Sequence, residues 1–357
     1  MTRRGLLRLD PIRLATIVVT LVTMVLANDN EAATRIVDSK CQDYVNMVST
    51  PHDIITLDLD SPVRQSYTLQ CPLQNPYVVG GKAVQKDEFP HMVALGYVPQ
   101  LYVDDTRYTF QCGGTLISEL FVLTAAHCIN KYLKIARLGI VDVGDPDGQD
   151  FAIEEQIIHE EYSPVTKYND LALLRLGRNV TITLHLRPAC LATDRAERNR
   201  RATVTGWGKT GRVSGLSNVL NKVSLDVPED RRACARSYSG PGQARLVDRQ
   251  ICAGSLDGNQ DACQGDSGGP LQVFDEDKCR YHVLGVVSYG KICGSAEYGV
   301  YTRVSRYLEW IVARVWPDEW ARKEQRHATC SIRRRRTMPL SEGPGRLHRL
   351  QHVSSSP

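Results

Sequence analysis

The sequence predicts an all-β fold built from short antiparallel strands, arranged as a barrel or a sandwich. From Val78 onward, short runs of β-branched and aromatic residues alternate with turns rich in Gly, Pro and Asn. Many short strands with little helix between them are typical of antiparallel barrels and sandwiches. The clearest strands are expected at residues 89–97, 114–117, 121–124, 202–208 and 283–289.

One helix is expected late in the chain, from Val304 to Val315, where apolar residues recur with the helical period. Pro317 should end it. Residues 317–357 then form a basic tail of low apolar content, with consecutive arginines from Arg333 to Arg336. We expect this tail to be disordered.

Residues 1–27 have the pattern of a secretory signal peptide. Four arginines precede an apolar run from Leu14 to Leu26. Ala27 then supplies the small residue of a cleavage site. A membrane anchor would need about 20 apolar residues, so we predict a secreted, extracellular protein with no membrane partner. Residues 28–77 are polar, contain Cys41 and Cys71 and show little periodicity, which indicates a pro-segment.

Charge and cysteine content narrow the class of protein further. The formal net charge is +4, but the basic excess lies in the signal peptide and the tail, so no nucleic-acid partner is expected. Eleven cysteines behind a signal peptide indicate disulfides rather than metal ligation. We expect no metal and no cofactor.

Three separated motifs carry chemistry. His127 lies in the stretch 123–128, Asp170 opens an apolar run, and Ser267 lies in a glycine-rich turn. Serine becomes a useful nucleophile only beside a base, and that base needs an orienting carboxylate. Alone, His127 could be a core histidine and Asp170 a turn residue, but together the three indicate a catalytic triad.

These motifs resemble those of the chymotrypsin/trypsin family of serine endopeptidases, over Val78 to about Trp316. The nearest resemblance is to arthropod haemolymph cascade proteases of the snake and persephone type. Only two cysteines precede Val78, so we expect no full clip domain. The resemblance implies two six-stranded antiparallel β-barrels with a C-terminal helix, all within residues 78–316. It also rests on four further segments: 89–92, 110–114, 187–191 and 299–304.

The resemblance also assigns roles to residues. Ser267 would attack a peptide carbonyl, His127 would transfer the proton, Asp170 would orient the imidazole, and the N–H groups of Gly265 and Ser267 would form the oxyanion hole. A second group would bind the substrate residue before the scissile bond and favour Arg or Lys; it comprises Asp261, Ser288, Gly290 and Gly299.

Activation is expected to follow cleavage between Tyr77 and Val78, because the new Val78 ammonium would pair with Asp266. An enzyme that cuts after Arg or Lys should not cleave after Tyr77. We therefore expect an upstream protease of chymotrypsin-like preference.

The resemblance implies the disulfides Cys112–Cys128, Cys234–Cys252 and Cys263–Cys293, and a tether from Cys190 to the pro-segment through Cys71. With Cys330 set aside, Cys41 and Cys279 remain. These two could form a second tether. Alternatively, the four cysteines could pair as Cys41–Cys71 and Cys190–Cys279.

The function predicted is a secreted zymogen of a trypsin-like endopeptidase in an extracellular immune or developmental cascade. Expected partners are protein substrates such as downstream zymogens, the activating protease and serpin-type inhibitors. The alternatives are a digestive trypsin and a non-catalytic binding homologue. Asn179, in Asn179-Val180-Thr181, is a candidate N-glycosylation site.

Overall fold

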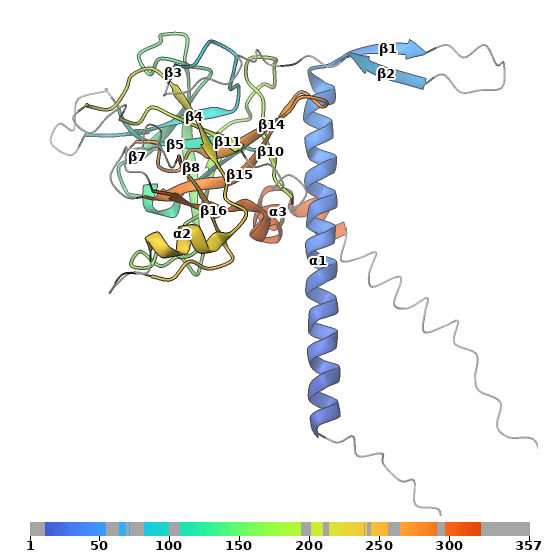
Figure 1. Ribbon diagram of the computed structural model, residues 1–357. Helices are drawn as coiled ribbons and strands as arrows, with labels where there is room; N and C mark the ends of the chain where they lie inside the picture. Colours follow the sequence, from blue (N-terminus) through green and yellow to red (C-terminus); the bar gives the residue numbers. More distant parts are fainter. Residues whose placement is uncertain are drawn as a thin grey trace, which may run out of the picture.

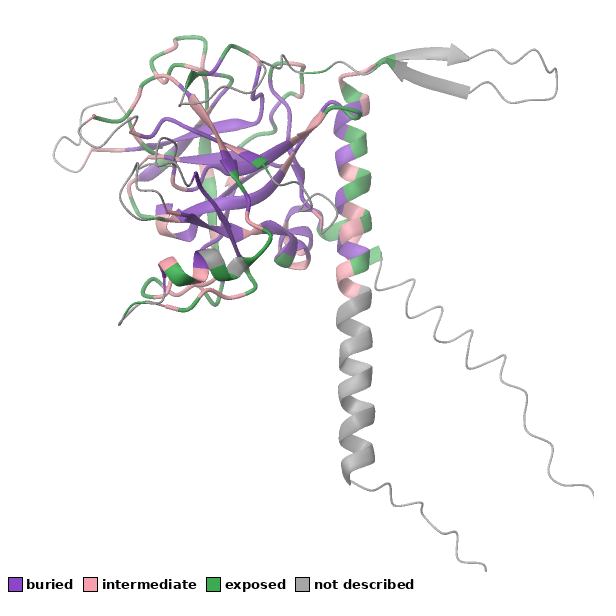
Figure 2. Ribbon diagram, in the orientation of Figure 1, coloured by how far each residue is buried: buried purple, intermediate pink, exposed green. Residues whose placement is uncertain are grey.

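Two antiparallel β-barrels, with helices near both ends of the chain, make up the structure (Figure 1). The computed structural model describes residues 11–54, 64–68, 71, 82–99, 108–193, 201–209, 214–238, 240, 244–255, 265–290 and 297–322. Figure 2 shows that many of the barrel strands are largely buried, as expected of strands that share an interior, whereas residues 149–158 are mostly exposed.

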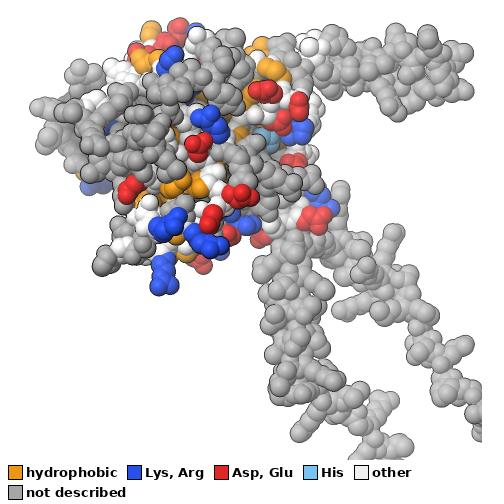
Figure 3. Space-filling view, viewed as in Figure 1, with side chains coloured by type: hydrophobic (Ala, Val, Ile, Leu, Met, Phe, Trp, Pro, Cys, Tyr) orange, Lys and Arg blue, Asp and Glu red, His pale blue; other side chains and the backbone are white. Residues whose placement is uncertain are grey.

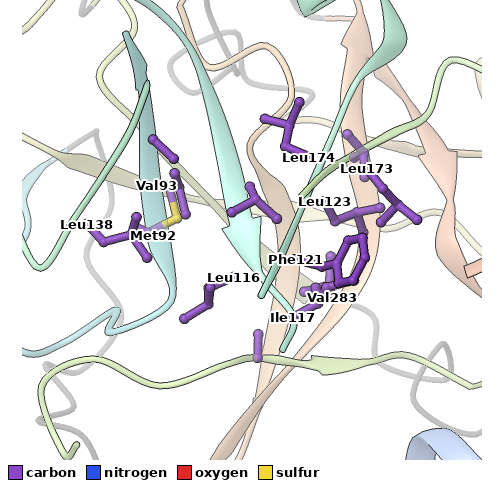
Figure 4. Packing of buried hydrophobic residues seen from close by; sticks show 14 of the residues in the cluster. Met92, Val93, Leu116, Ile117, Phe121, Leu123, Leu138, Leu173, Leu174 and Val283 are labelled. Carbon is purple, nitrogen blue, oxygen red and sulfur yellow. The ribbon is translucent and has the colours of Figure 1, made fainter. Parts of the chain in front are cut away.

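The first barrel is closed, with the strand order β4-β5-β6-β9-β8-β7. Strands β4 and β6 are buried along their whole length, which agrees with the apolar runs in their sequences. Leu123 of β6 pairs with Leu173 of β9, and both belong to the core cluster of Figure 4. The six strands are β4 Met92–Tyr97, β5 Thr109–Leu116, β6 Phe121–Thr124, β7 Leu133–Leu138, β8 Gln149–Ile158 and β9 Ala172–Leu176.

The second barrel has the order β13-β16-β15-β14-β11-β12. A single bridge closes it, because Asp226, the last residue of β12, and Gly254, the residue after β13, exchange two backbone hydrogen bonds of 3.0 Å. The predicted pair of six-stranded barrels is thus confirmed. The strands are β11 Arg201–Gly206, β12 Asn221–Asp226, β13 Gln250–Ala253, β14 Pro270–Asp275, β15 Arg280–Tyr289 and β16 Gly299–Arg303.

Short elements complete this part of the chain. Strand β3 (Lys82–Ala83) pairs with β12, and β10 (Cys190–Leu191) pairs in parallel with β15. Helix α2 (Arg231–Ser237) was not predicted, and Asp230 caps it by accepting the Arg232 N–H at 2.9 Å. On the face drawn in Figure 3, the described acidic and basic side chains are interspersed.

The predicted C-terminal helix is present but divided. A 3-10 turn, η3 (Val304–Arg306), precedes helix α3 (Leu308–Val315), which buries Leu308, Ile311 and Val312. Residues 317–322 are helical again, so the start of the predicted tail is ordered. Proline is favoured in the first turn of a helix, because the N–H group that it lacks would have no intrahelical acceptor there. The remainder of that tail lies outside the described residues.

The first half of the predicted pro-segment is helical, although its sequence showed little periodicity. Helix α1 runs Pro11–Met47, and its buried residues Ala33, Val37, Cys41 and Tyr44 follow the helical period. Alanine, cysteine and tyrosine give a weak hydropathy signal, so the pattern was missed. A hairpin of β1 (Thr50–Ile54) and β2 (Arg64–Thr68) follows. No helix within the described residues is long and apolar enough to span a membrane.

Four disulfides connect described residues. Cys112–Cys128 and Cys234–Cys252 are the pairs that the resemblance implied. The expected Cys71–Cys190 bond is wrong, because Cys190 pairs with Cys41 and Cys71 pairs with Cys279. Packing of α1 against β10 brings Cys41 to Cys190, which leaves Cys71 to the β14–β15 turn. The pair Cys263–Cys293 and Cys330 lie outside the described residues.

Candidate active site

The pairing of β6 with β9 brings His127 and Asp170 to the same end of the first barrel. His127 lies in the 3-10 turn η1 (Ala126–Cys128) just after β6, and Asp170 lies two residues before β9. Thr124 at the end of β6 is the register partner of Ala172 at the start of β9. The residues that flank this pair, His127 and Asp170, are therefore neighbours.

The Asp170 carboxylate accepts two hydrogen bonds from His127. Its Oδ1 accepts the backbone N–H at 2.9 Å, and its Oδ2 lies 2.7 Å from Nδ1. Asp170 is fully buried, whereas the His127 side chain is 20% exposed. A carboxylate acceptor on Nδ1 places the proton there in the neutral ring, which leaves Nε2 available as a base.

The second barrel also holds Asp170. Ser288 of β15 donates from Oγ to Asp170 Oδ2 at 2.5 Å, and Thr302 of β16 donates to the Asp170 carbonyl at 2.8 Å. Ser288 was predicted among the substrate-binding residues, and its bond to Asp170 was missed. A polar residue that ends the apolar run 283–287 was the available signal.

Ser267 lies in a turn that requires glycine on both sides. Gly265 and Gly268 have φ angles of +102° and +76°, which disfavour side chains. A Cβ on Gly268 would lie 2.6 Å from the Gly113 carbonyl oxygen, so the turn packs closely on β5. The Gly113 N–H in turn donates to the Ser267 carbonyl at 2.8 Å.

The Cys112–Cys128 disulfide links this turn to His127. Cys112 is adjacent to Gly113, which contacts the Ser267 turn, and Cys128 is adjacent to His127. A ring nitrogen of His127 and both sulfurs lie within 4.8 Å of one another. Both thiols are oxidised in the disulfide, so the cluster offers no thiolates to a metal. The structure thus brings together His127, Asp170 and the Ser267 turn.

The backbone N–H groups of the turn divide into two sets. Those of Gly268 and Gly269 donate to Val287 and Asp266 carbonyls at 2.9 Å. Those of Gly265 and Ser267 donate to no acceptor among the described residues. Backbone N–H groups that have no described acceptor, on the nucleophile and two residues before it, are the kind of donors that stabilise a developing oxyanion.

The Asp266 carboxylate contacts the backbone of residues 206–208. Asp266 is 9% exposed, and its Oδ1 accepts the Gly208 N–H at 2.9 Å. A Cβ on Gly206 would lie 2.1 Å from the same oxygen, so only glycine leaves room for the carboxylate. Val78, its expected partner, lies outside the described residues.

The expected substrate pocket is described in part. Gly290 and Gly299 face each other, since a Cβ on Gly290 would lie 3.8 Å from Gly299 Cα. Asp261 lies outside the described residues.

Comparison with protein families matches residues 78–311 to the family described as Trypsin. The chain belongs to the trypsin family of serine endopeptidases. Serine protease snk of Drosophila melanogaster is 36% identical over 295 residues, which cover 80% of this chain and 66% of that protein. Serine protease Hayan of the same species is 36% identical over 258 residues, 68% of this chain and 39% of that protein.

A third relative of this trypsin-family chain is the CLIP domain-containing serine protease HP8 of Bombyx mori. It is 38% identical over 272 residues, which cover 69% of this chain and 71% of that protein. The predicted resemblance to arthropod serine proteases and the predicted enzyme class are thus confirmed. The chain spans less than two thirds of the length of snk and Hayan.

Proposed function

We propose that this serine endopeptidase is made as a secreted zymogen that cuts protein substrates after Arg or Lys once Val78 is freed. The observation that carries the catalytic part is the buried Asp170 carboxylate, which contacts both His127 and Ser288 next to the Ser267 turn. The preference for Arg or Lys rests on Asp261, six residues before Ser267. A carboxylate at the base of a closed pocket favours a cationic side chain.

Each residue of the site has its own role in the reaction. His127 Nε2 removes the proton of Ser267 Oγ as that oxygen attacks the carbonyl carbon, and it later returns the proton to the leaving amine. Asp170 stabilises the imidazolium formed in between. The Gly265 and Ser267 N–H groups bind the oxyanion, and each such donor contributes about 2.7 to 4 kcal/mol to transition-state stabilisation.

Activation depends on Asp266. Its buried carboxylate favours a cation nearby, and an α-amino group, with a pKa of about 7.7 to 8.0, is largely charged at neutral pH. We infer that the Val78 ammonium supplies this cation after cleavage at Tyr77, which an upstream chymotrypsin-like protease would perform. In the family that the chain resembles, such a pair completes the substrate pocket and the oxyanion hole.

The setting is inferred from the signal peptide, the disulfides and the arthropod relatives. It is an extracellular cascade, with protein substrates, an upstream activator and serpin-type inhibitors as partners. Asn179, which is exposed, is the proposed glycosylation site. Labelling of Ser267 by a fluorophosphonate would exclude the non-catalytic homologue.

The test uses the full zymogen, cut with a chymotrypsin-like protease and examined by N-terminal sequencing. We expect Val78 at the new terminus and amidolysis of Arg and Lys reporter peptides, with little cleavage of Phe peptides. Ser267→Ala is the matched control and should lose this activity while being cut identically. Equal turnover of Arg and Phe peptides would refute the pocket assignment, and activity retained in Ser267→Ala would refute the nucleophile.

A further inference from the structure

A tight turn centred on Asp170 fixes the backbone of that residue. The Leu171 N–H donates to the Asn169 carbonyl at 2.8 Å, which closes a three-residue turn with Asp170 in the middle. The place of the Asp170 carboxylate therefore depends on the conformation of Asn169, the residue before it.

Asn169 has a left-handed backbone. Its φ angle is +54°, a region that few residues with a Cβ adopt and that asparagine tolerates better than most. Glycine would adopt the same angle without strain. A need for this angle alone would thus be met by glycine, so the contacts of the asparagine side chain are a separate question.

The Asn169 side chain uses both ends of its amide. Its Nδ2 donates to the Glu161 carbonyl at 2.9 Å. Its Oδ1 accepts from the Tyr307 hydroxyl and from Arg249 Nη1, both at 2.9 Å. Aspartate could not donate to a carbonyl, and glycine could make none of the three bonds. The amide thus ties the residue before Asp170 to three separate segments of the chain.

Tyr307 and Arg249 both come from the second half of the chain. Tyr307 lies between η3 and α3 and is 3% exposed, and Arg249 immediately precedes β13. The Arg249 guanidinium lies 5.7 Å from the centre of the Tyr307 ring. The His159 ring meets the Tyr307 ring edge-on, with 5.3 Å between the centroids. These contacts hold the Tyr307 hydroxyl in one place against Asn169.

We propose that the hydrogen bond between Tyr307 and Asn169 positions the acid of the triad. It fixes the turn at Asp170 and so the direction in which that carboxylate meets His127. Neither side chain hydrogen-bonds to His127 or to the Asp170 carboxylate within the described part of the chain, so both are positioning residues that act through the backbone. This inference rests on the proposed function, because it takes Asp170 as the acid of the triad.

The first test removes the Tyr307 hydroxyl from the activated enzyme. Tyr307→Phe keeps the ring and should lower kcat for an Arg reporter peptide about two- to tenfold, the factor that one neutral hydrogen bond supplies. KM should not change, because neither Tyr307 nor Asn169 touches the substrate. An unchanged kcat would overturn the inference, whereas activity retained in Ser267→Ala would refute the proposed function instead.

Tyr281→Phe is the matched control for this variant. Tyr281 is also buried, and its hydroxyl donates to the Glu88 carbonyl at 2.9 Å. The control therefore loses one buried hydroxyl without changing the turn at Asp170. Its kcat should equal that of wild type, and an equal loss in Tyr281→Phe and Tyr307→Phe would overturn the inference.

Asn169→Gly separates the side chain from the backbone angle. Glycine suits a φ of +54°, so full activity in this variant would show that only the angle matters, against the inference. We expect kcat to fall about 10- to 100-fold, because a small displacement of a reacting group can cost about 100-fold. Adding Tyr307→Phe should cause no further loss, since both changes remove the same hydrogen bond. Additive losses would contradict the shared role.

A spectroscopic measurement removes the dependence on turnover. A short hydrogen bond from an imidazole N–H to a carboxylate moves its proton NMR signal far downfield. His127 Nδ1 lies 2.7 Å from Asp170 Oδ2, so the Ser267→Ala zymogen should show such a signal. Tyr307→Phe and Asn169→Gly in that background should shift it upfield, and Tyr281→Phe should not. An identical signal in all four folded proteins would overturn the inference.

Discussion

Ser288 and His127 share one oxygen of Asp170. Ser288 Oγ lies 2.5 Å from Oδ2, and His127 Nδ1 lies 2.7 Å from the same atom. The acid on the first barrel is therefore oriented by a hydroxyl on β15 of the second. A misplacement of the two barrels would rotate the carboxylate away from the imidazole, so the triad depends on the contact between barrels.

Ser288→Ala should reduce kcat/KM about 10- to 150-fold, because a hydrogen bond to a charged group contributes roughly 1.5 to 3 kcal/mol. Amidolysis of an Arg reporter by the activated enzyme measures this. Thr302→Val is the control, since Thr302 contacts the Asp170 carbonyl and not the carboxylate. If both variants lose equal activity, the two residues hold the segment rather than orient the acid.

After cleavage at Tyr77, the pro-segment becomes a separate light chain. Two independent disulfides should keep this light chain attached to the protease domain. Wild type should run as one species without reductant and as two with it. The paired variants Cys41→Ser/Cys190→Ser and Cys71→Ser/Cys279→Ser should each stay linked, because each retains the other bond. Replacement of all four cysteines should release the light chain without reductant.

The two disulfide pairings considered from the sequence can be distinguished from the pairing in the structure. With Cys41–Cys71 and Cys190–Cys279, wild type would separate without any reductant. Non-reducing peptide mapping identifies the linked cysteines directly, and a peptide joining Cys71 to Cys190 would contradict the structure.

The sequence indicated a triad because its chemistry demands particular residue types in short motifs, and the structure places His127 against Asp170. Ser267 needs flanking glycines for a turn that no other residue allows, and His127 and Asp170 each border an apolar strand. Barrel strands were equally predictable, since β4 and the first three residues of β6 form apolar runs.

What could not be predicted depends on packing between distant segments. The partner of Cys190 is decided by where α1 contacts β10, and no local pattern near Cys41 encodes that contact. Likewise, the role of Ser288 follows from how the two barrels meet. Helix α1 was missed because its buried face includes alanine and a half-polar tyrosine that hydrogen-bonds Glu119 at 2.9 Å.

Helix α1 should contribute directly to stability, because Val37 lies in the same core cluster as Ile311 and Val312 of α3. Val37→Ala should lower the free energy of unfolding by about 1 to 3 kcal/mol. Arg35→Ala is the control, since that side chain is 64% exposed, and its effect should stay within about 0.5 kcal/mol. Equal stabilities in denaturant titrations of the Ser267→Ala zymogen would show that α1 does not pack on α3.

His91 should make stability fall in acid. It is 1% exposed, its Nε2 lies 2.5 Å from Gln272 Oε1, and burial lowers its pKa to about 3. The Arg187 charge lowers it further, while the Gln272 hydrogen bond opposes the shift. The unfolded chain has an ordinary histidine pKa of about 6.5, so between about pH 6.5 and 3 it binds one more proton at this position than the folded chain.

The contribution of neutral His91 is therefore complete above about pH 6.5 and is lost as the pH falls toward 3, at about 1.4 kcal/mol per pH unit. His91→Gln cannot titrate but keeps a hydrogen-bond donor for Gln272. Urea unfolding of the Ser267→Ala zymogen should show wild type losing stability relative to His91→Gln from pH 6 to pH 4. The difference between them should be constant from pH 7 to 8, and parallel curves across the acid range would mean that His91 is protonated in the folded protein.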